Sequence, residues 1–362
     1  MKNIILFGGA FDPIHNGHLN MAFFASKELD ADVLFIPAKK SVWKDETAPI
    51  SDKINMIKLA INGYPRFKID TFEADRKEDV TYSIETVRHF ASIYKDANLY
   101  YLIGVDQVNE FHRWKECDEI AKLVKLIFFV RPGFELKQEN VERFHMMALK
   151  ADSTSDAASN QIRDLQSFEA PLEVLDYIID HHLYAIPKLE TYFTEKRFNH
   201  SKSVARLAYE IAMANGYKTS GRAYLAGLLH DLGKNVSGES AEKIMKEQFP
   251  EYFDMPLWSY HQFIGSYLAK KDFKVVDEEI LNAIKYHATG KDNMTDLQKI
   301  VYAADKLDPN RGYDSVDLIK AMKNDISGGF LIVLKENIDY IKACGKNVSN
   351  MLTDSCIKYY LK

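Results

Sequence analysis

The sequence predicts an α/β protein in which a doubly wound parallel sheet is followed by an all-α half. Three observations predict this architecture. A chain of 362 residues is too long for one ordinary hydrophobic core and suits two domains. Short apolar runs alternate with helical patterns in the first half, as in a parallel sheet covered by helices. Strand patterns end near Pro171, and only helical segments follow. We therefore expect one domain over residues 1–186 and a second over 187–362.

Four apolar runs are the expected strands of the first domain: Ile4–Phe7, Val33–Ile36, Leu99–Ile103 and Leu126–Val130. Amphipathic stretches such as Ile84–Tyr94 lie between them and are the expected helices. Ligands of such sheets bind at the carboxyl ends of the strands. The loops that follow the strands are therefore where we expect the chemistry.

The second half reads as helical throughout. Residues 172–183 predict a helix that closes the first domain, and Pro187 interrupts the pattern and marks the boundary. Beyond it, helical segments are separated by glycines rather than by strand patterns. This arrangement predicts a helical second domain with its own core.

The composition limits the binding partners and the cellular compartment that we expect. A net charge of −5 gives no reason to expect a nucleic acid as partner. The three cysteines are odd in number and form no CxxC pair, which favours a reducing compartment. No apolar run approaches the roughly 20 residues of a membrane helix, and no secretion signal is recognisable. We expect a cytoplasmic protein without membrane contact, and homo-oligomers are left open.

The first chemical signal follows the first expected strand. The string Gly8-Gly9-Ala10-Phe11-Asp12-Pro13-Ile14-His15-Asn16-Gly17-His18 leads into a helical run, Leu19–Leu29. Glycines let the backbone approach a phosphate, and the amides at a helix N-terminus favour an anion. His15 and His18 are three positions apart, so both imidazoles can donate to one phosphate chain.

This string resembles the GGxFDPxHxGH signature of nucleotidyltransferases of the nicotinate-mononucleotide adenylyltransferase type, and every signature position is present. The resemblance covers about residues 1–185. It implies transfer of AMP from ATP, which carries Mg²⁺, to nicotinate mononucleotide, with nicotinate adenine dinucleotide and pyrophosphate as products. The protein would position two anions and stabilise charge in the transition state.

Further segments match the family in order. Residues 81–86 resemble its SYTxDT segment, with Ser83 in place of threonine, and residues 157–163 resemble ISSTxIR, with Asn160 in place of threonine. The resemblance assigns phosphate stabilisation to His15, His18, Lys44 and Arg163. It assigns substrate contacts to Gly8, Gly9, Phe11, Asp12, Thr81, Tyr82, Ser83, Gly104, Asp106, Trp114, Arg131, Ser159 and Asn160.

The acceptor substrate has alternatives. A sister transferase acting on phosphopantetheine or on nicotinamide mononucleotide would carry a similar glycine–histidine string. The hydroxyl of Ser83 suits a nicotinate carboxylate, and the family stacks an aromatic ring on the pyridine at the position of Trp114. These two residues favour nicotinate mononucleotide.

The second half carries a set of metal-ligand residues on predicted helices. In chain order they are His200, His230, Asp231, His261, His287 and Asp305. Imidazole and carboxylate ligands suit a divalent metal that must also hold water and phosphate. The set resembles the HD phosphohydrolase superfamily, and over residues 190–362 it is similar to the bacterial symmetrical diadenosine-tetraphosphate hydrolases.

That resemblance implies cleavage of diadenosine tetraphosphate (Ap4A) into two ADP at a centre of two divalent metals, commonly iron. Asp231 would bridge the two ions, His261 and His287 would bind the second, and Lys234 and Arg311 would hold phosphates. Another nucleotide, such as a dNTP or a guanosine alarmone, is an alternative substrate. An inactive regulatory module is a further alternative, and the complete ligand set argues against it.

Overall fold

The computed structural model describes residues 1–40, 48–78, 80–130, 135–150, 158–312, 314–347 and 349–361. The chain forms two compact units. The first contains Met1–Ser159 and Glu173–His181, and the second contains Asn160–Leu172 and His182–Lys362. The chain crosses between them at 159–160, 172–173 and 181–182, and the single boundary expected after residue 186 stays a prediction.

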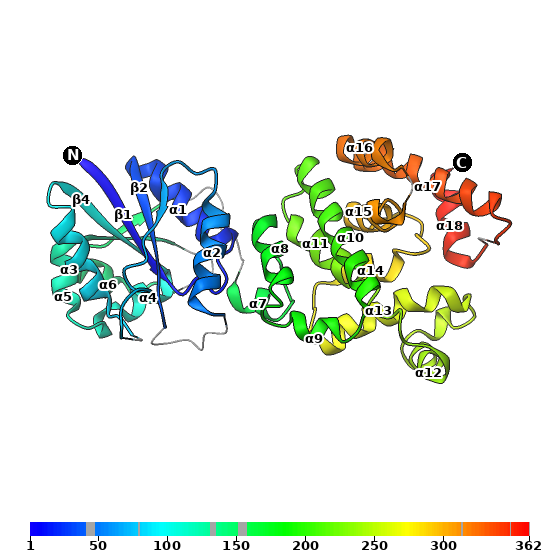
Figure 1. Ribbon diagram of the computed structural model, residues 1–362, viewed down its shortest axis with the longest axis horizontal. Helices are drawn as coiled ribbons and strands as arrows, with labels where there is room; N and C mark the ends of the chain where they lie inside the picture. Colours follow the sequence, from blue (N-terminus) through cyan, green and yellow to red (C-terminus); the bar gives the residue numbers. More distant parts are fainter. Residues whose placement is uncertain are drawn as a thin grey trace. The chain divides into compact units, whose positions relative to one another are not determined.

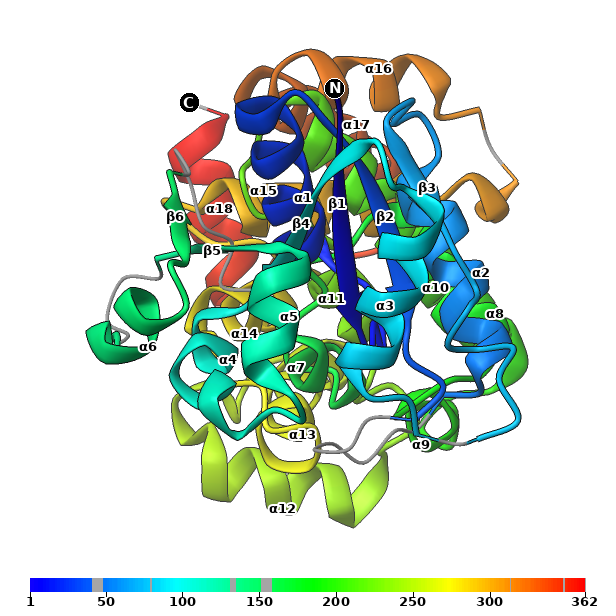
Figure 2. The same cartoon turned by 90° about the vertical axis from the view of Figure 1, so that its left-hand side faces the viewer.

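The first unit is built on a six-stranded parallel sheet with the order β3-β2-β1-β4-β5-β6, which Figure 2 shows from right to left. The strands are β1 Lys2–Gly9, β2 Ala31–Pro37, β3 Phe67–Ile69, β4 Ala97–Ile103, β5 Lys125–Phe129 and β6 Met147–Leu149. From β1 the chain adds strands toward one edge of the sheet, and from β4 it adds them toward the other edge, so the doubly wound sheet is confirmed. Ligands of such sheets bind where the strand order reverses, here between β1 and β4.

Helices cover both faces of the sheet. Figure 1 shows α1 (Asn16–Leu29) and α2 (Ile50–Ile61) on one face, with α3 (Ser83–Ile93) and α5 (Cys117–Leu123) on the other. Two shorter helices, α4 Val105–Glu110 and α6 Gln138–Arg143, follow strands or loops. The helix α7, Ser159–Arg163, begins at the last residue of the first unit and continues in the second. The helix α8, Leu172–Asp180, returns to the first unit, where the Tyr177 hydroxyl donates to Asp52 of α2 at 2.7 Å.

The strands predicted from sequence are the central ones. Their side chains are buried from both sides, so they read as continuous apolar runs. Ile5, Phe35 and Phe128, for example, are fully buried. The edge strands β3 and β6 are three residues each and were not predicted, because so short a segment carries too little pattern.

The second unit is helical, and no strand occurs among its described residues. Its helices are α9 Ile186–Glu190, α10 Glu195–Ala214, α11 Ser220–Leu229, α12 Gly238–Gln248, α13 Tyr260–Asp272, α14 Glu278–Tyr286, α15 Asp296–Lys306, α16 Val316–Asn324, α17 Ile326–Ala343 and α18 Met351–Tyr360 (Figure 1). Helices α10 and α11 cross closely, because a Cβ on Gly227 would lie 2.8 Å from the Cα of Ala205. The expected all-α architecture is confirmed.

None of the helices in the described ranges is both long and apolar enough to cross a membrane.

Candidate active sites

The first candidate site lies where β1 ends and α1 begins. The loop between them brings the side chains of His15 and His18 together, with ring centroids 3.8 Å apart and planes inclined by 28°. His15 is the N-cap of α1, and its Nδ1 accepts a hydrogen bond from Gly17 N at 3.1 Å. This cap explains why α1 begins at Asn16, three residues before the helix expected from sequence.

The hydrogen bonds of these rings fix their tautomers. His15 Nδ1 accepts from Gly17 N, and His18 Nδ1 accepts from His15 N at 3.3 Å. A neutral imidazole whose Nδ1 is an acceptor carries its proton on Nε2. Both rings are therefore N–H donors at a helix N-terminus, as an anion site requires.

Phe11 and Asp12 lie inside this loop. Phe11 is 2% exposed, and its ring packs edge-on against His18 with centroids 5.0 Å apart. A Cβ on Gly9 would lie 3.1 Å from the Phe11 ring, so the second glycine makes room for that ring. Asp12 is 3% exposed. The buried Phe11 ring thus packs against the His18 imidazole.

Two of the predicted substrate-binding residues, Ser83 and Trp114, lie beside Tyr101 of β4, which the sequence did not single out. The Tyr101 hydroxyl lies 3.4 Å from Ser83 Oγ at the start of α3, and its ring meets Trp114 edge-on at 6.2 Å. Thr81 Oγ1 is buried and has no hydrogen-bond partner among the described residues. Tyr82 is exposed, with the Lys115 ammonium 4.2 Å from its ring centroid.

Two of the predicted substrate contacts, Gly104 and Asp106, follow β4. Gly104 is the N-cap of the six-residue helix α4, and Asp106 is the second residue of that helix. A Cβ on Gly104 would lie 2.5 Å from Asp106 Oδ1, so the carboxylate folds back over the glycine. Asp106 is exposed to solvent, where a ligand can reach it.

The last predicted motif is divided between the units. The Ser159 hydroxyl donates to the carbonyl of Pro13 at 3.0 Å and so joins the glycine–histidine loop. Asn160 and Arg163 belong to the second unit. Lys44 and Arg131 lie outside the described residues.

The second candidate site lies among α10, α11 and α13–α15. Three of its imidazoles share one arrangement: Nδ1 donates to the backbone carbonyl three residues earlier. His230 donates to Gly227 at 2.7 Å, His261 to Trp258 at 2.8 Å and His287 to Ile284 at 2.7 Å. A neutral ring bonded in this way presents a lone pair at Nε2, as a metal ligand must.

Asp231 joins these ligands into two groups. Its Oδ2 lies 3.8 Å from His230 Nε2, and its Oδ1 lies 3.5 Å from His261 Nε2 and 3.8 Å from His287 Nε2. Two sets of donors close enough to hold a metal ion result, and both include Asp231. They are His200 with His230 and Asp231, and Asp231 with His261 and His287.

The lone pairs fit a cation. His261 Nε2 and His287 Nε2 are 3.1 Å apart, the separation expected of two imidazoles on one metal at about 2.1 Å each. Two facing lone pairs repel each other unless a cation lies between them. His230 Nε2 is fully buried and has no hydrogen-bond partner among the residues that the structure describes. An unpartnered buried nitrogen is costly, so the donor set suits resident divalent metals.

Asp308 orients the fourth imidazole and was not predicted. His200 Nδ1 lies 2.5 Å from Asp308 Oδ2, while the other oxygen of Asp308 accepts from the Ser203 hydroxyl at 2.6 Å. His200 Nε2 faces Asp305 Oδ1 at 3.3 Å. A carboxylate behind a ligand histidine is the usual support of a metal site.

Four cationic side chains surround the carboxylates. Lys306 and Arg311 contact Asp305 at 2.7 and 2.5 Å, Arg197 donates to Asp231, and Lys234 lies 3.3 Å from His261 Nε2. Lys234 and Arg311 were predicted as phosphate contacts, and Arg197 and Lys306 were not. No local sequence signal marks Arg197, because its partner is 34 positions away.

Burial and neighbouring charges set the protonation states of the proposed metal ligands. Burial lowers the pKa of His261 to about 4, helped by the Lys234 ammonium, and burial holds the pKa of His287 well below its usual range. Burial alone would raise the pKa of Asp305, but Lys306 and the hydrogen bond with His200 hold it well below the usual range. At neutral pH His261 and His287 are therefore neutral, and Asp305 is ionised. His200 differs, because its hydrogen bonds with Asp305 and Asp308 outweigh burial and raise its pKa to about 9.

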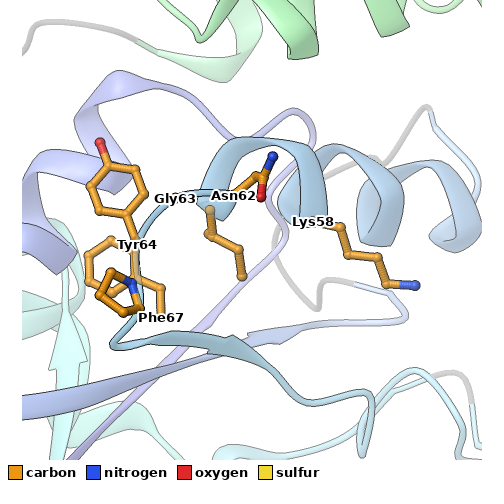
Figure 3. Close-up of a pocket in the computed structure, with 7 residues that line it drawn as sticks. Lys58, Asn62, Gly63, Tyr64 and Phe67 are labelled. Carbon is orange, nitrogen blue, oxygen red and sulfur yellow. The ribbon is translucent and has the colours of Figure 1, made fainter.

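A separate surface pocket of about 480 Å³ lies between the end of α2 and the start of β3. Figure 3 shows Lys58, Asn62, Tyr64 and Phe67 around it. Phe67 is the first residue of its strand, so this pocket lies at the amino edge of the parallel sheet. It contains none of the predicted site residues.

Comparison with known proteins gives matches along most of the chain. Residues 6–165 match the cytidylyltransferase-like family, and residues 197–310 match the HD domain family. The chain is 34% identical to the "Probable nicotinate-nucleotide adenylyltransferase/Ap4A hydrolase" of Mycoplasma genitalium, over 92% of this chain and 97% of that protein.

The protein of the same name from Mycoplasma pneumoniae is 32% identical over 95% of this chain and all of its own length. A "Probable nicotinate-nucleotide adenylyltransferase" of Clostridium tetani is 35% identical over 45% of this chain and 86% of that protein. The chain belongs to the family of enzymes, represented by the two mycoplasma proteins, that joins a cytidylyltransferase-like domain to an HD domain.

Proposed function

We propose that the first unit transfers AMP from ATP to nicotinate mononucleotide, and that the second unit hydrolyses diadenosine tetraphosphate to two ADP. The paired Nε2–H donors of His15 and His18 at the start of α1 support the transferase. The two metal-ligand groups that share Asp231 support the hydrolase. The names of the full-length mycoplasma relatives agree with both activities.

The transferase reaction needs no protein nucleophile. A phosphate oxygen of nicotinate mononucleotide attacks the α-phosphorus of ATP, and the bond to the β-phosphate oxygen breaks to release pyrophosphate. Charge builds on the phosphate oxygens as this occurs, and the two imidazole N–H groups donate to them. Mg²⁺ arrives with ATP as part of the substrate. Lys44 and Arg163 are proposed to add positive charge to the same phosphates.

Selection of the nicotinate ring is assigned to Thr81, Ser83 and Trp114. The Thr81 hydroxyl, which has no partner in the described part of the chain, and the Ser83 hydroxyl can hydrogen-bond a carboxylate. The Trp114 ring offers an aromatic surface. A site built for a hydrogen-bonded group rejects analogues that lack it. Nicotinate mononucleotide should therefore be preferred over the amide form, and equal kcat/KM for the two would overturn this assignment.

In the second unit, His200, His230, Asp231 and Asp305 are proposed to hold one divalent ion, with His261, His287 and Asp231 holding another. Iron is the expected metal. Two such ions, when bound, polarise a phosphate oxygen and make water a better nucleophile. Asp308 orients His200. Lys234 and Arg311, which lie beside His261 and Asp305, are proposed to hold the tetraphosphate.

Product analysis of the purified chain tests both proposals. Incubation with ATP and nicotinate mononucleotide should give nicotinate adenine dinucleotide and pyrophosphate in equal amounts. A separate incubation with Ap4A should give ADP alone, since symmetrical cleavage yields neither ATP nor AMP. A dNTP and a guanosine alarmone serve as competitors, and faster hydrolysis of either would replace Ap4A as the substrate.

Cytoplasmic location is also part of the proposal. The three cysteines form no disulfide, which is the usual state in a reducing compartment.

A further inference from the structure

Gly8 faces the hydroxyl of Tyr101. The two residues lie on neighbouring strands, where Tyr101 of β4 pairs with Leu6 of β1. A Cβ on Gly8 would lie 2.8 Å from the Tyr101 hydroxyl oxygen but 3.6 Å from the ring carbon that carries it. The first distance is too short for any real contact, and the second is ordinary van der Waals contact. Within the part of the chain that the structure describes, the Tyr101 hydroxyl alone would lie too close to a Cβ at position 8.

The backbone at Gly8 does not itself require glycine. Gly8 is absent from the glycines with positive φ, so its conformation is open to other residues. Tyr101 is 4% exposed and packed in the core of the first unit, so it cannot move aside cheaply. The close approach of these two residues is therefore a fixed feature of the β1–β4 pair.

The same hydroxyl reaches the recognition segment. It lies 3.4 Å from Ser83 Oγ, and the Tyr101 ring packs edge-on against Trp114 at 6.2 Å. One buried phenol thus contacts the glycine turn and the two residues assigned to the pyridine. Moving the phenol would change the spacing between the phosphate-binding loop and the pyridine side.

We propose that Tyr101 is the positioning residue of the nicotinate side of the first site, and that its hydroxyl excludes a Cβ at position 8. Tyr101 fixes Gly8, Ser83 and Trp114 relative to one another. The assignment of nicotinate to this side rests on the proposed function. The contact between Tyr101 and Gly8 does not depend on it.

A double-mutant cycle on the full chain tests the contact. Gly8→Ala should lower the Tm and reduce adenylyl transfer, because its methyl group meets the Tyr101 hydroxyl. In combination with Tyr101→Phe the same change should lower the Tm little, because 3.6 Å to the ring is acceptable. Recovery of the Tm in the double variant is the expected result. A double variant with a Tm as low as that of Gly8→Ala alone would contradict the contact with the Tyr101 hydroxyl.

Tyr101→Phe alone tests the positioning role. Loss of one neutral hydrogen bond to Ser83 should raise KM for nicotinate mononucleotide about fivefold, with KM for ATP and kcat nearly unchanged. Tyr100→Phe is the matched control, since adjacent strand residues point to opposite faces. Equal effects on both substrates, or the same result with Tyr100→Phe, would contradict positioning. Failure of the unaltered chain to use nicotinate mononucleotide would instead overturn the proposed function. The Tm values of the double-mutant cycle would still test the contact between Tyr101 and Gly8.

Discussion

In the first unit the Nδ1 atoms of His15 and His18 accept hydrogen bonds from backbone amides. In the second unit the Nδ1 atoms of His230, His261 and His287 donate to backbone carbonyls. The first arrangement leaves the proton on Nε2, and the second leaves a lone pair there. The backbone partner of Nδ1 thus leaves Nε2 suited to an anion in the first unit and to a cation in the second.

The largest expected effect separates the two sites. His230→Ala combined with Asp231→Ala removes ligands from both metal groups, and Ap4A hydrolysis should be abolished. Synthesis of nicotinate adenine dinucleotide should continue at the parental rate, because no first-unit donor is changed. Parallel product assays on the same preparation measure both activities. Loss of both in a folded protein would indicate that the two sites are coupled.

A single substitution made in each site tests the tautomer comparison. His18→Ala should lower kcat for adenylyl transfer about a hundredfold or more, as loss of one preorganised donor does. His18→Gln keeps an N–H donor and should recover part of that loss. His287→Gln offers a poor metal ligand and should not recover the loss caused by His287→Ala. If His18→Gln is as inactive as His18→Ala, a donor at that position is not what the reaction needs.

The outcome of the sequence analysis follows from how far apart the interacting residues lie. The central strands and the glycine–histidine string are local patterns, so they could be predicted. Tyr101 was missed because its contacts with Gly8 and Ser83 exist only after β4 pairs with β1. Asp308 was missed because it lies 108 positions from His200. The ligand set itself was recognisable from its order, whereas the protonation pattern of the rings needed the structure.

The next largest expected effect is a loss of bound metal from the second unit. His261→Ala or His287→Ala should each lower the metal content from two ions per chain to about one, since each removes a ligand of one group and leaves the other intact. Elemental analysis of protein purified without chelators measures this. His181→Ala, an exposed histidine outside both groups, is the control. Two ions retained in both variants would show that these imidazoles are not ligands.

Buried carboxyls give a second contrast between the units. Asp231 and Asp305 are buried among imidazoles and cations, and their pKa values are lowered. Glu73 is buried in the first unit, accepts a hydrogen bond from the Thr86 hydroxyl at 2.5 Å, and has its pKa raised to about 7. Burial is the main cause, and neither Thr86 nor Arg76 offsets it. The charges around a buried carboxyl, rather than its burial alone, therefore decide whether its pKa is raised or lowered.

The smallest expected effect follows from Glu73. Its pKa in the folded chain, about 7, is above the ordinary 4.5, so folding favours the protonated carboxyl. Stability is then fully present below about pH 4.5 and falls as the pH rises toward 7, because the unfolded chain ionises more readily. Glu73→Gln removes this loss, so its Tm should exceed that of the parent at pH 8 by a few degrees, with the difference shrinking toward pH 5. Glu139→Gln, at an exposed position, is the control. A Tm difference that does not change between pH 5 and pH 8 would show that Glu73 stays ionised in the folded chain.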